Sequence, residues 1–204
     1  MSKTLLSLFA AALCCTVFAG ETIKLPPPQK EGGTAFFTVL AQRRSIRSYA
    51  MEQLSPQELS TLLWAGFGIS GAGDRRTAPT AVNRREFTLY ALLESGAYKY
   101  LPKDNELEKV CAEDLRKFAG GNVTAPVYIL LVADLKRAAN AEYAAIDTGY
   151  ISQNLYLAAT SMKMGSCALG GFRRNEVGMA ALRTKLNLAD DQKIMLSQAV
   201  GKIK

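Results

Sequence analysis

Histidine is absent from all 204 residues of the sequence. Its absence excludes Ser-His-Asp and Cys-His catalytic arrangements, because both need an imidazole base. It also excludes the zinc, haem and non-haem iron sites that depend on histidine ligands. We therefore expect any chemistry to come from Arg, Lys, Ser, Thr, Asn or carboxylate side chains, or from a bound organic cofactor.

Cysteine is also scarce, with four residues in the whole chain. Cys14 and Cys15 lie in a segment that we expect to be removed, which leaves Cys111 and Cys167. Two cysteines cannot form a metal site alone, so we predict no metal site. Pairing of the two remains open in an oxidising compartment, but Cys111 falls in an apolar helical pattern that favours a buried free thiol.

A strong bias of charge is absent as well. The 25 Lys and Arg residues against 18 Asp and Glu residues give a net charge of +7, and 49% of the residues are hydrophobic. This composition is typical of one globular domain, or of a subunit that completes its core by dimerising, and it excludes wholesale disorder. Because the basic residues are scattered rather than gathered in a patch, we expect no nucleic-acid binding.

The first 19 residues have the pattern of a secretory signal peptide. Lys3 gives a positive charge, an apolar run follows from Leu5 to Phe18, and Ala19 is a small residue at the cleavage position. The run is too short to span a bilayer comfortably, so we expect no stable membrane anchor. A lipoprotein would need a small residue before Cys14, where Leu13 is bulky. We predict cleavage after Ala19 and an exported protein, periplasmic or secreted.

A proline-rich stretch follows the predicted signal peptide. Residues 20–32 contain Pro26-Pro27-Pro28 and are predicted to form an extended, flexible tether. A single domain is then expected over residues 33–204, with no internal repeat.

Hydrophobic periodicity in this domain predicts a mixture of helices and strands. Helices are expected over residues 35–44, from the N-cap Ser55 through Pro56 and Glu58 to Phe67, and over residues 105–118, 146–164 and 175–186. Strands are expected over residues 87–93, 127–133 and 194–200. The segment 146–164 is apolar nearly all round, which predicts a central helix buried by the sheet and by a partner subunit.

Three polar segments stand out against this packing. Arg43-Arg44-Ser45-Ile46-Arg47 brings three guanidinium groups together, and such groups bind phosphate oxygens in pairs, although a basic cluster also suits a helix C-terminus. Residues 76–83 form a loop of small residues that follows three glycines. Leu169-Gly170-Gly171-Phe172 allows either a close approach to a ligand or a simple turn. No single one of them identifies a function.

Taken in order, the segments resemble the nitroreductase family of FMN-dependent oxidoreductases. The resemblance rests on Arg43-Arg44-Ser45-Ile46-Arg47, on Ala78-Pro79-Thr80-Ala81-Val82-Asn83 before a strand, on the run from Asp147 to Ala159, and on Met164-Gly165-Ser166 with Leu169-Gly170-Gly171-Phe172. These matches extend from about residue 33 to residue 201. The resemblance implies an α+β fold with a mostly antiparallel central sheet flanked by helices, in a homodimer with FMN at its interface.

The resemblance also implies a set of FMN contacts. Arg43, Ser45 and Arg47 match positions that hold the phosphate, the ribityl chain and the pyrimidine edge, and the match for Arg44 contributes a further contact. The remaining contacts are Pro79, Thr80, Ala81 and Asn83 from the partner subunit, near the flavin ring, and Leu169, Gly170 and Gly171 on the other side of the ring. No catalytic residue is implied, although a cation such as Arg47 would stabilise the negative charge of a reduced flavin.

The activity implied is a ping-pong reduction of nitroaromatic, quinone or similar acceptors by NAD(P)H or another donor. Two other interpretations remain open: a specialised relative, such as an azoline-type dehydrogenase or a flavin-fragmenting or dehalogenating enzyme, and a flavin-binding protein without turnover. The chain departs from the family by ending at Lys204, so that Lys202 or Lys204 would have to replace a basic residue of a longer tail. Its short loop over residues 133–145 predicts an open site. Export is in tension with the use of NAD(P)H, which is scarce outside the cytoplasm.

Overall fold

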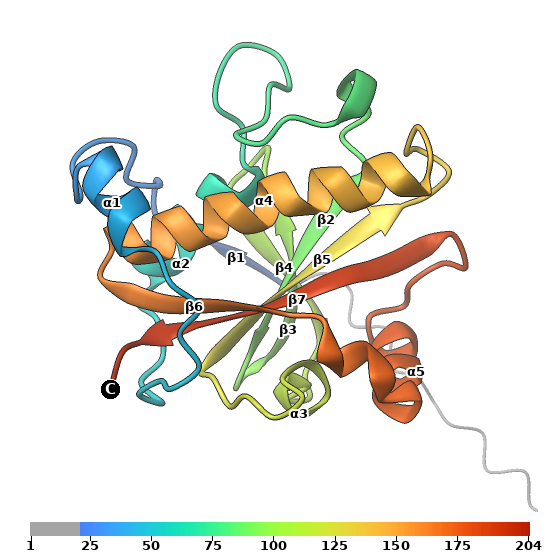
Figure 1. Ribbon diagram of the computed structural model, residues 1–204. Coiled ribbons are helices and arrows are strands. Elements are labelled where there is room, and N and C mark those ends of the chain that lie inside the picture. Colours follow the sequence, from blue (N-terminus) through green and yellow to red (C-terminus); the bar gives the residue numbers. More distant parts are fainter. Residues whose placement is uncertain (1–20) are drawn as a thin grey trace, which may run out of the picture.

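The computed structural model describes residues 21–204, which fold into one sheet covered by helices on both faces (Figure 1). The predicted signal peptide, residues 1–19, lies outside the described residues. The strands are β1 (Thr22–Lys24), β2 (Phe87–Leu93), β3 (Gly96–Leu101), β4 (Glu106–Cys111), β5 (Val127–Asp134), β6 (Met164–Leu169) and β7 (Gln192–Lys202). The α-helices are α1 (Phe36–Gln42), α2 (Pro56–Phe67), α3 (Arg116–Ala119), α4 (Ala141–Ser161) and α5 (Glu176–Lys185).

The seven strands lie in the order β1-β4-β3-β2-β5-β7-β6. All neighbouring strands in this order are antiparallel. The predicted α+β class with an antiparallel sheet is therefore confirmed. None of the helices in residues 21–204 combines the length and the hydropathy that crossing a bilayer requires.

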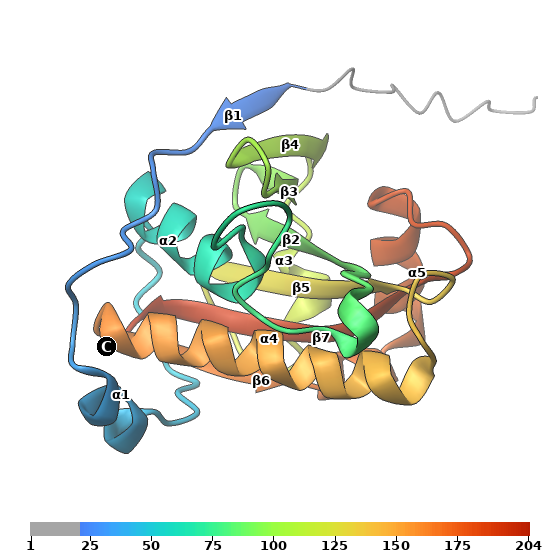
Figure 2. The same ribbon diagram turned by 90° about the horizontal axis from the view of Figure 1, so that it is seen from above.

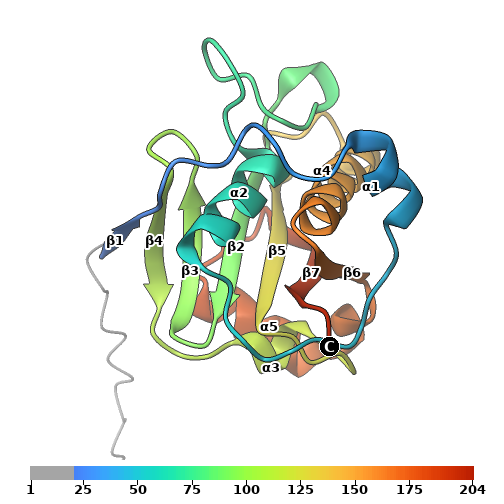
Figure 3. The same ribbon diagram turned by 90° about the vertical axis from the view of Figure 1, so that its left-hand side faces the viewer.

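The sheet separates two hydrophobic cores. Helices α2 and α4 cover one face and the short helix α3 and α5 cover the other, as the side view shows (Figure 3). Successive side chains of a strand point to opposite faces, so β5 serves both cores. Its residues Val127, Ile129, Leu131 and Ala133 join the first core, and Tyr128, Leu130 and Val132 join the second. This double burial explains why the strand is a continuous apolar run.

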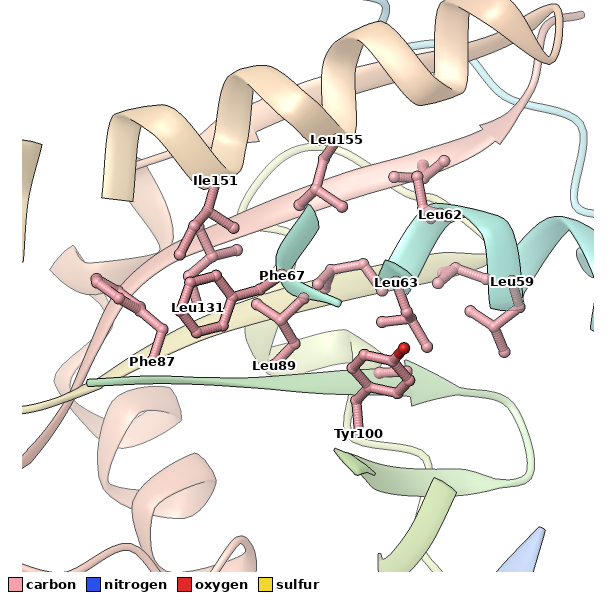
Figure 4. Close-up of a cluster of buried hydrophobic side chains, with 14 of the residues drawn as sticks. Leu59, Leu62, Leu63, Phe67, Phe87, Leu89, Tyr100, Leu131, Ile151 and Leu155 are labelled. Atoms are coloured by element: carbon pink, nitrogen blue, oxygen red, sulfur yellow. The ribbon is translucent and has the colours of Figure 1, made fainter. Parts of the chain in front are cut away.

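The first core lies between α2, α4 and the centre of the sheet. In Figure 4 Leu59 and Leu63 of α2 point down to the sheet and Leu62 points up toward α4, while Ile151 and Leu155 of α4 point to the same core beside Leu89 and Leu131. Helix α2 starts as predicted: Ser55 Oγ accepts a hydrogen bond from the backbone N–H of Glu58 at 3.2 Å, and the Glu58 carboxylate accepts one from the N–H of Ser55 at 2.7 Å. This capping box sets the first turn of the helix.

Helix α4 is longer at its start than predicted and is not buried all round. It begins at Ala141 because the side chain of Asn140 caps it, accepting a hydrogen bond from the N–H of Tyr143 at 2.9 Å. Its inner side is buried against the sheet, whereas its outer side exposes large apolar residues. The exposed fractions of Tyr143, Ile146 and Tyr150 are 47%, 45% and 46%.

The predicted helix over residues 105–118 is wrong. Residues Glu106–Cys111 form β4, which pairs with β3, and only Arg116–Ala119 are helical. The positive φ of Asn105, 54°, belongs to the turn that joins β3 and β4. Cys111 is accordingly half-buried at the end of a strand instead of lying in a helical stripe, and it forms no disulfide with the buried Cys167.

The N-terminal arm, residues 21–34, is extended as predicted, but it packs on the domain rather than hanging free (Figure 2). Ile23 is opposite Leu107 in the pairing of β1 with β4, and Leu25 is buried. The carbonyl oxygen of Pro26 accepts hydrogen bonds from Ser60 Oγ at 2.6 Å and from the amide nitrogen of Asn105 at 2.9 Å. The described folded unit therefore starts near residue 22 rather than residue 33, because apolar burial and carbonyl acceptors hold the prolines in place.

Candidate functional site

The arginine segment, Arg43–Arg47, leaves α1 and runs along the outer edge of β6. The helix ends at Gln42, and Ser45 forms a parallel bridge with Ser166. The N–H of Ile46 donates a hydrogen bond to the carbonyl oxygen of Ser166 at 2.9 Å. The chain continues beside β7, where the N–H of Ala50 donates to the carbonyl oxygen of Lys202 at 2.9 Å. The segment therefore covers the edge of the sheet, and these backbone hydrogen bonds hold its main chain in place.

The side chains of this segment carry charge that the described chain does not neutralise. Arg44 and Arg47 are exposed and Arg43 is half-buried. No ion pair within residues 21–204 includes any of the three. Lys202, a predicted replacement for a family tail residue, pairs instead with Glu52.

Tyr156 of α4 lies under the arginine segment and was not predicted as a site residue. Its hydroxyl is 2.9 Å from Ser45 Oγ and accepts a hydrogen bond from the N–H of Ala168 at 2.8 Å. The guanidinium carbon of Arg43 is 5.1 Å from the centre of its ring, within the range of a cation–π interaction. The sequence does offer one signal for this residue. Tyr156 lies in a helix that was expected to be buried, and a buried phenol needs a polar partner.

The glycine segment, Leu169–Phe172, begins at the last residue of β6 and leads into a short 3-10 turn that starts at Gly171. A Cβ atom built on Gly171 would meet no atom within 4 Å, and one on Gly170 would meet only the Arg173 guanidinium at 3.9 Å. Gly170 has an ordinary φ of −91°. Neither packing within the chain nor backbone conformation requires glycine here, so the open space above the segment is available to a ligand.

The loop segment, residues 78–83, lies at a different place on α4. The buried carboxylate of Asp147 accepts a hydrogen bond from the N–H of Ala81 at 2.8 Å and so fixes the loop. Val82 and Asn83 have φ of 46° and 55°, and both side chains face solvent. Asp147 and Tyr156 are nine residues apart on α4, about 13 Å along its axis. Within one subunit the loop segment and the arginine segment are therefore held at separate points.

Asp147 also belongs to a buried carboxyl pair with Glu86, whose exposed fraction is 2%. Burial raises the pKa of Glu86, and the neighbouring Asp147 carboxyl raises that pKa further, whereas Arg137 opposes the rise. Oε2 of Glu86 receives no hydrogen-bond donor from the described residues. The folded state therefore favours the protonated form of Glu86.

The variant Glu86→Gln should make the fold less sensitive to rising pH. A carboxyl group with a raised folded-state pKa stabilises the protein below its unfolded pKa of about 4.5, and this contribution is lost as the pH rises through the folded value. We expect the variant and the parent to melt alike at and below pH 4.5, and the variant to melt higher as the pH rises above that value. Thermal melting across that range, with the exposed Glu94→Gln as a control, tests this; parallel curves for Glu86→Gln and the parent would contradict it.

A cavity of about 650 Å³ opens between the N-terminal arm, α1, α2 and α4. Its apolar lining includes Trp64, Leu157 and Met162, and Asn154 contributes an amide. The ammonium group of Lys30 is 5.7 Å from the centre of the Trp64 ring. None of the predicted FMN contacts lines this cavity.

Comparison with known proteins agrees with this architecture. The sequence model of the nitroreductase family matches residues 40–202. The chain is 27% identical over 177 residues to "Putative nitroreductase MJ1384" of Methanocaldococcus jannaschii, a match that covers 78% of this chain and 89% of that protein.

Solved structures share the fold as well. A "putative nitroreductase" from Ralstonia eutropha JMP134 superimposes with a TM-score of 0.81 and 29% identity over 90% of each chain. A "putative nitroreductase in complex with FMN" from Desulfovibrio desulfuricans gives a TM-score of 0.62 at 19% identity, covering 84% of this chain and 88% of that one, which shows likeness of fold. Because the family match spans most of the sequence and includes the arginine, loop and glycine segments, this chain belongs to the nitroreductase family.

Proposed function

We propose that the protein is an FMN-dependent oxidoreductase that takes electrons from NAD(P)H, or from another small donor, and passes them to nitroaromatic, quinone or similar acceptors. Membership of the nitroreductase family supports a flavin oxidoreductase in general. The observation that carries the proposal is the arginine segment: three guanidinium groups on a backbone tied to β6, with no carboxylate partner among the described residues.

The residues present fit an FMN molecule. A phosphate dianion is bound best by guanidinium groups and hydroxyls, which Arg43 and Ser45 supply side by side. The open space above Gly170 and Gly171 would accept a flat ring close to the backbone. Arg47 would bring a positive charge to the pyrimidine edge.

When bound, FMN supplies a ring that accepts and donates hydride. In this proposal Arg43 and Ser45 hold the phosphate, and the bridge from Ser45 to Ser166 keeps that anchor at a fixed distance from the glycine segment. The Arg47 guanidinium would be the residue that stabilises negative charge on a bound flavin ring. Because the chain has no histidine, we assign proton delivery to solvent.

We also propose that two copies of the chain associate through α1 and the outer side of α4. Phe36 and Phe37 of α1 are 59% and 81% exposed, and α1 packs at the C-terminal end of α4, whose exposed apolar residues lie nearer its N-terminal end. Gly149 lies on the same side of α4, and a Cβ atom there would meet nothing within 4 Å. A glycine within a helix costs about 1 kcal/mol relative to alanine, and a close approach by another chain would explain it. Association would also bring the loop segment of one copy toward the other.

The variant Tyr150→Glu should weaken this association by at least about tenfold, because it places a charge within an apolar interface. Sedimentation equilibrium of the parent should give the mass of a dimer, and the variant should shift toward the monomer. Val177→Glu is the matched control, since Val177 is 78% exposed on α5, on the opposite side of the sheet. A monomeric parent, or equal dissociation of both variants, would contradict the proposal.

Export through a cleaved signal peptide is a further part of the proposal and is supported by the N-terminal sequence pattern alone. Sequencing of the mature protein should begin at Gly20. A protein that retains Met1 would contradict it.

The activity is tested by the visible spectrum of residues 20–204. We expect a yellow protein whose released cofactor is FMN, which NADPH or dithionite bleaches and which a quinone or nitroaromatic re-oxidises. A colourless protein that FMN cannot reconstitute would overturn the proposal. A bound flavin that dithionite bleaches but that no acceptor re-oxidises faster than buffer would instead indicate a flavin-binding protein without turnover.

A further inference from the structure

We propose that Tyr156 is a positioning residue that holds Arg43 and Ser45 ready to bind the phosphate of FMN. The inference rests on the proposed function and adds a residue that the sequence did not single out. Tyr156 is only 8% exposed, and it joins three separate parts of the chain: α4, the arginine segment and β6.

The hydrogen bonds of the phenol give it a direction. The N–H of Ala168 can only donate, so the Tyr156 oxygen accepts that bond. Either hydroxyl could donate in the 2.9 Å contact between Tyr156 and Ser45 Oγ, and we assign the donor to Tyr156 because its proton has no other acceptor among the hydrogen bonds described for residues 21–204. Ser45 then uses one oxygen lone pair for Tyr156 and keeps its hydroxyl proton. Ser45 is exposed, so this proton points to a surface where an anion can accept it. Hydrogen bonds in such a chain polarise one another, which strengthens the last donor.

The ring of Tyr156 acts on the guanidinium of Arg43. Arg43 follows the last residue of α1, and its guanidinium carbon is 5.1 Å from the ring centre. An arginine side chain loses about 2 kcal/mol of rotamer entropy when it is fixed. Contact with the Tyr156 ring restricts the Arg43 side chain before any ligand binds. Less conformational entropy is then lost on binding, so more of the favourable energy of the Arg43–phosphate contact appears as affinity.

The two groups that Tyr156 contacts are those that the proposed function assigns to the phosphate. Gly170 and Gly171, which would face the ring, have no contact with Tyr156 among the hydrogen bonds and ring contacts described for residues 21–204. Loss of the phenol hydroxyl should therefore weaken recognition of the phosphate more than recognition of the ring, which Tyr156 reaches only through the N–H of Ala168 in β6.

Tyr156→Phe keeps the ring and removes the hydroxyl. We expect the dissociation constant for FMN, measured by quenching of flavin fluorescence, to rise about tenfold. Riboflavin lacks the phosphate, so its dissociation constant should change by less than about twofold. Tyr100→Phe, which removes a buried, hydrogen-bonded phenol hydroxyl from β3, is the matched control and should change neither value.

A double-mutant cycle with Ser45→Ala gives a second measurement. If the hydroxyls act as one chain, Ser45→Ala alone should weaken FMN binding by a similar factor, and the double variant should lose little more than either single variant. Should Tyr156→Phe fold poorly, the parent and Ser45→Ala can still be compared by the ratio of their affinities for FMN and riboflavin. A fall of this ratio in Ser45→Ala is expected if the hydroxyl chain that ends at Ser45 recognises the phosphate.

Three results would overturn the inference: unchanged FMN affinity in Tyr156→Phe, equal losses for FMN and riboflavin, or fully additive losses in the cycle. The equal losses would indicate a general effect on the fold, and they would leave the proposed function intact. A parent protein that binds neither flavin would instead remove the proposed function, and this inference with it.

Discussion

Replacing Gln198 with leucine should lower the free energy of unfolding by about 3 kcal/mol. Gln198 of β7 is fully buried, and its amide makes three hydrogen bonds. Its oxygen accepts from Ser152 Oγ at 2.8 Å, and its nitrogen donates to Ser166 Oγ at 2.8 Å and to the carbonyl oxygen of Ser152 at 3.2 Å. Leucine fills a similar volume but leaves these buried groups without a partner, and each such loss costs about 1–3 kcal/mol. Urea denaturation measures the difference.

The neighbouring Ser197 provides a matched control. It is also fully buried on β7, but its hydroxyl has no hydrogen-bond partner among the described residues. Ser197→Ala should therefore leave the free energy of unfolding unchanged or raise it, since the variant removes an unsatisfied polar group. Equal losses for Gln198→Leu and Ser197→Ala would show that packing, rather than hydrogen bonding, accounts for the effect.

The network around Gln198 also connects stability to the candidate site. Ser166, whose Oγ accepts a hydrogen bond from the Gln198 amide, is the residue of β6 that bridges to Ser45. The same strand continues to the glycine segment. A loosened β6 would change the distance between the phosphate anchor and the surface proposed for the ring, so FMN affinity should fall in Gln198→Leu and not in Ser197→Ala.

The double variant Arg43→Ala/Arg47→Ala should weaken FMN binding by about a thousandfold. A hydrogen bond to a charged group contributes about 1.5–3 kcal/mol, and two such losses amount to about 4 kcal/mol. Fluorescence titration of the apoprotein with FMN measures this. The fold should be retained, because neither side chain forms an ion pair within the described residues.

Its control is Lys103→Ala/Lys136→Ala, which lowers the net charge by the same amount. Lys103 is exposed at the turn between β3 and β4, and Lys136 is exposed where it pairs with Asp191. FMN affinity should remain within about threefold of the parent, because exposed charges distant from the site act only through a screened field. A comparable loss in both double variants would attribute the binding to net charge and remove the assignment of the two arginines.

The parts of the fold that sequence predicted are those with a local signal. The capping box of Ser55 and Glu58 and the apolar run of β5 each lie within a few residues, and both are observed. Helix α5 is likewise found at Glu176–Lys185, after an asparagine cap. The predicted last strand over residues 194–200 lies within β7.

The missed strands lack a local pattern that distinguishes a strand from a loop or a helix. β1 is three residues long and pairs with β4, where Thr22 is opposite Glu108. β4 itself has apolar residues at positions that also fit a helix, and only its pairing with β3 resolves the ambiguity. β6 follows α4 after two residues, with Lys163 at a φ of 59°, so no loop separates the two patterns.

The residues of the candidate site likewise fall into those with a local sequence signal and those without one. Arg43, Ser45 and the glycines occur in short motifs that can be compared with a family. Tyr156 lies in the matched run from Asp147 to Ala159, but the resemblance assigned it no role, and Gln198 lies in no matched motif. Their roles come from contacts with segments 111 and 46 residues away. Glu86 was missed for a related reason, because a glutamate directly before a strand gives no sign in the sequence that the Asp147 carboxyl packs beside it.

The central claim is that the arginine segment binds the phosphate of FMN, and a crystal structure of the protein grown with FMN tests it most directly. The account predicts phosphate oxygens within hydrogen-bond distance of the Arg43 guanidinium and of Ser45 Oγ, with the ring lying over Gly170 and Gly171. A phosphate bound elsewhere, or a structure in which both groups face solvent at saturating FMN, would contradict it.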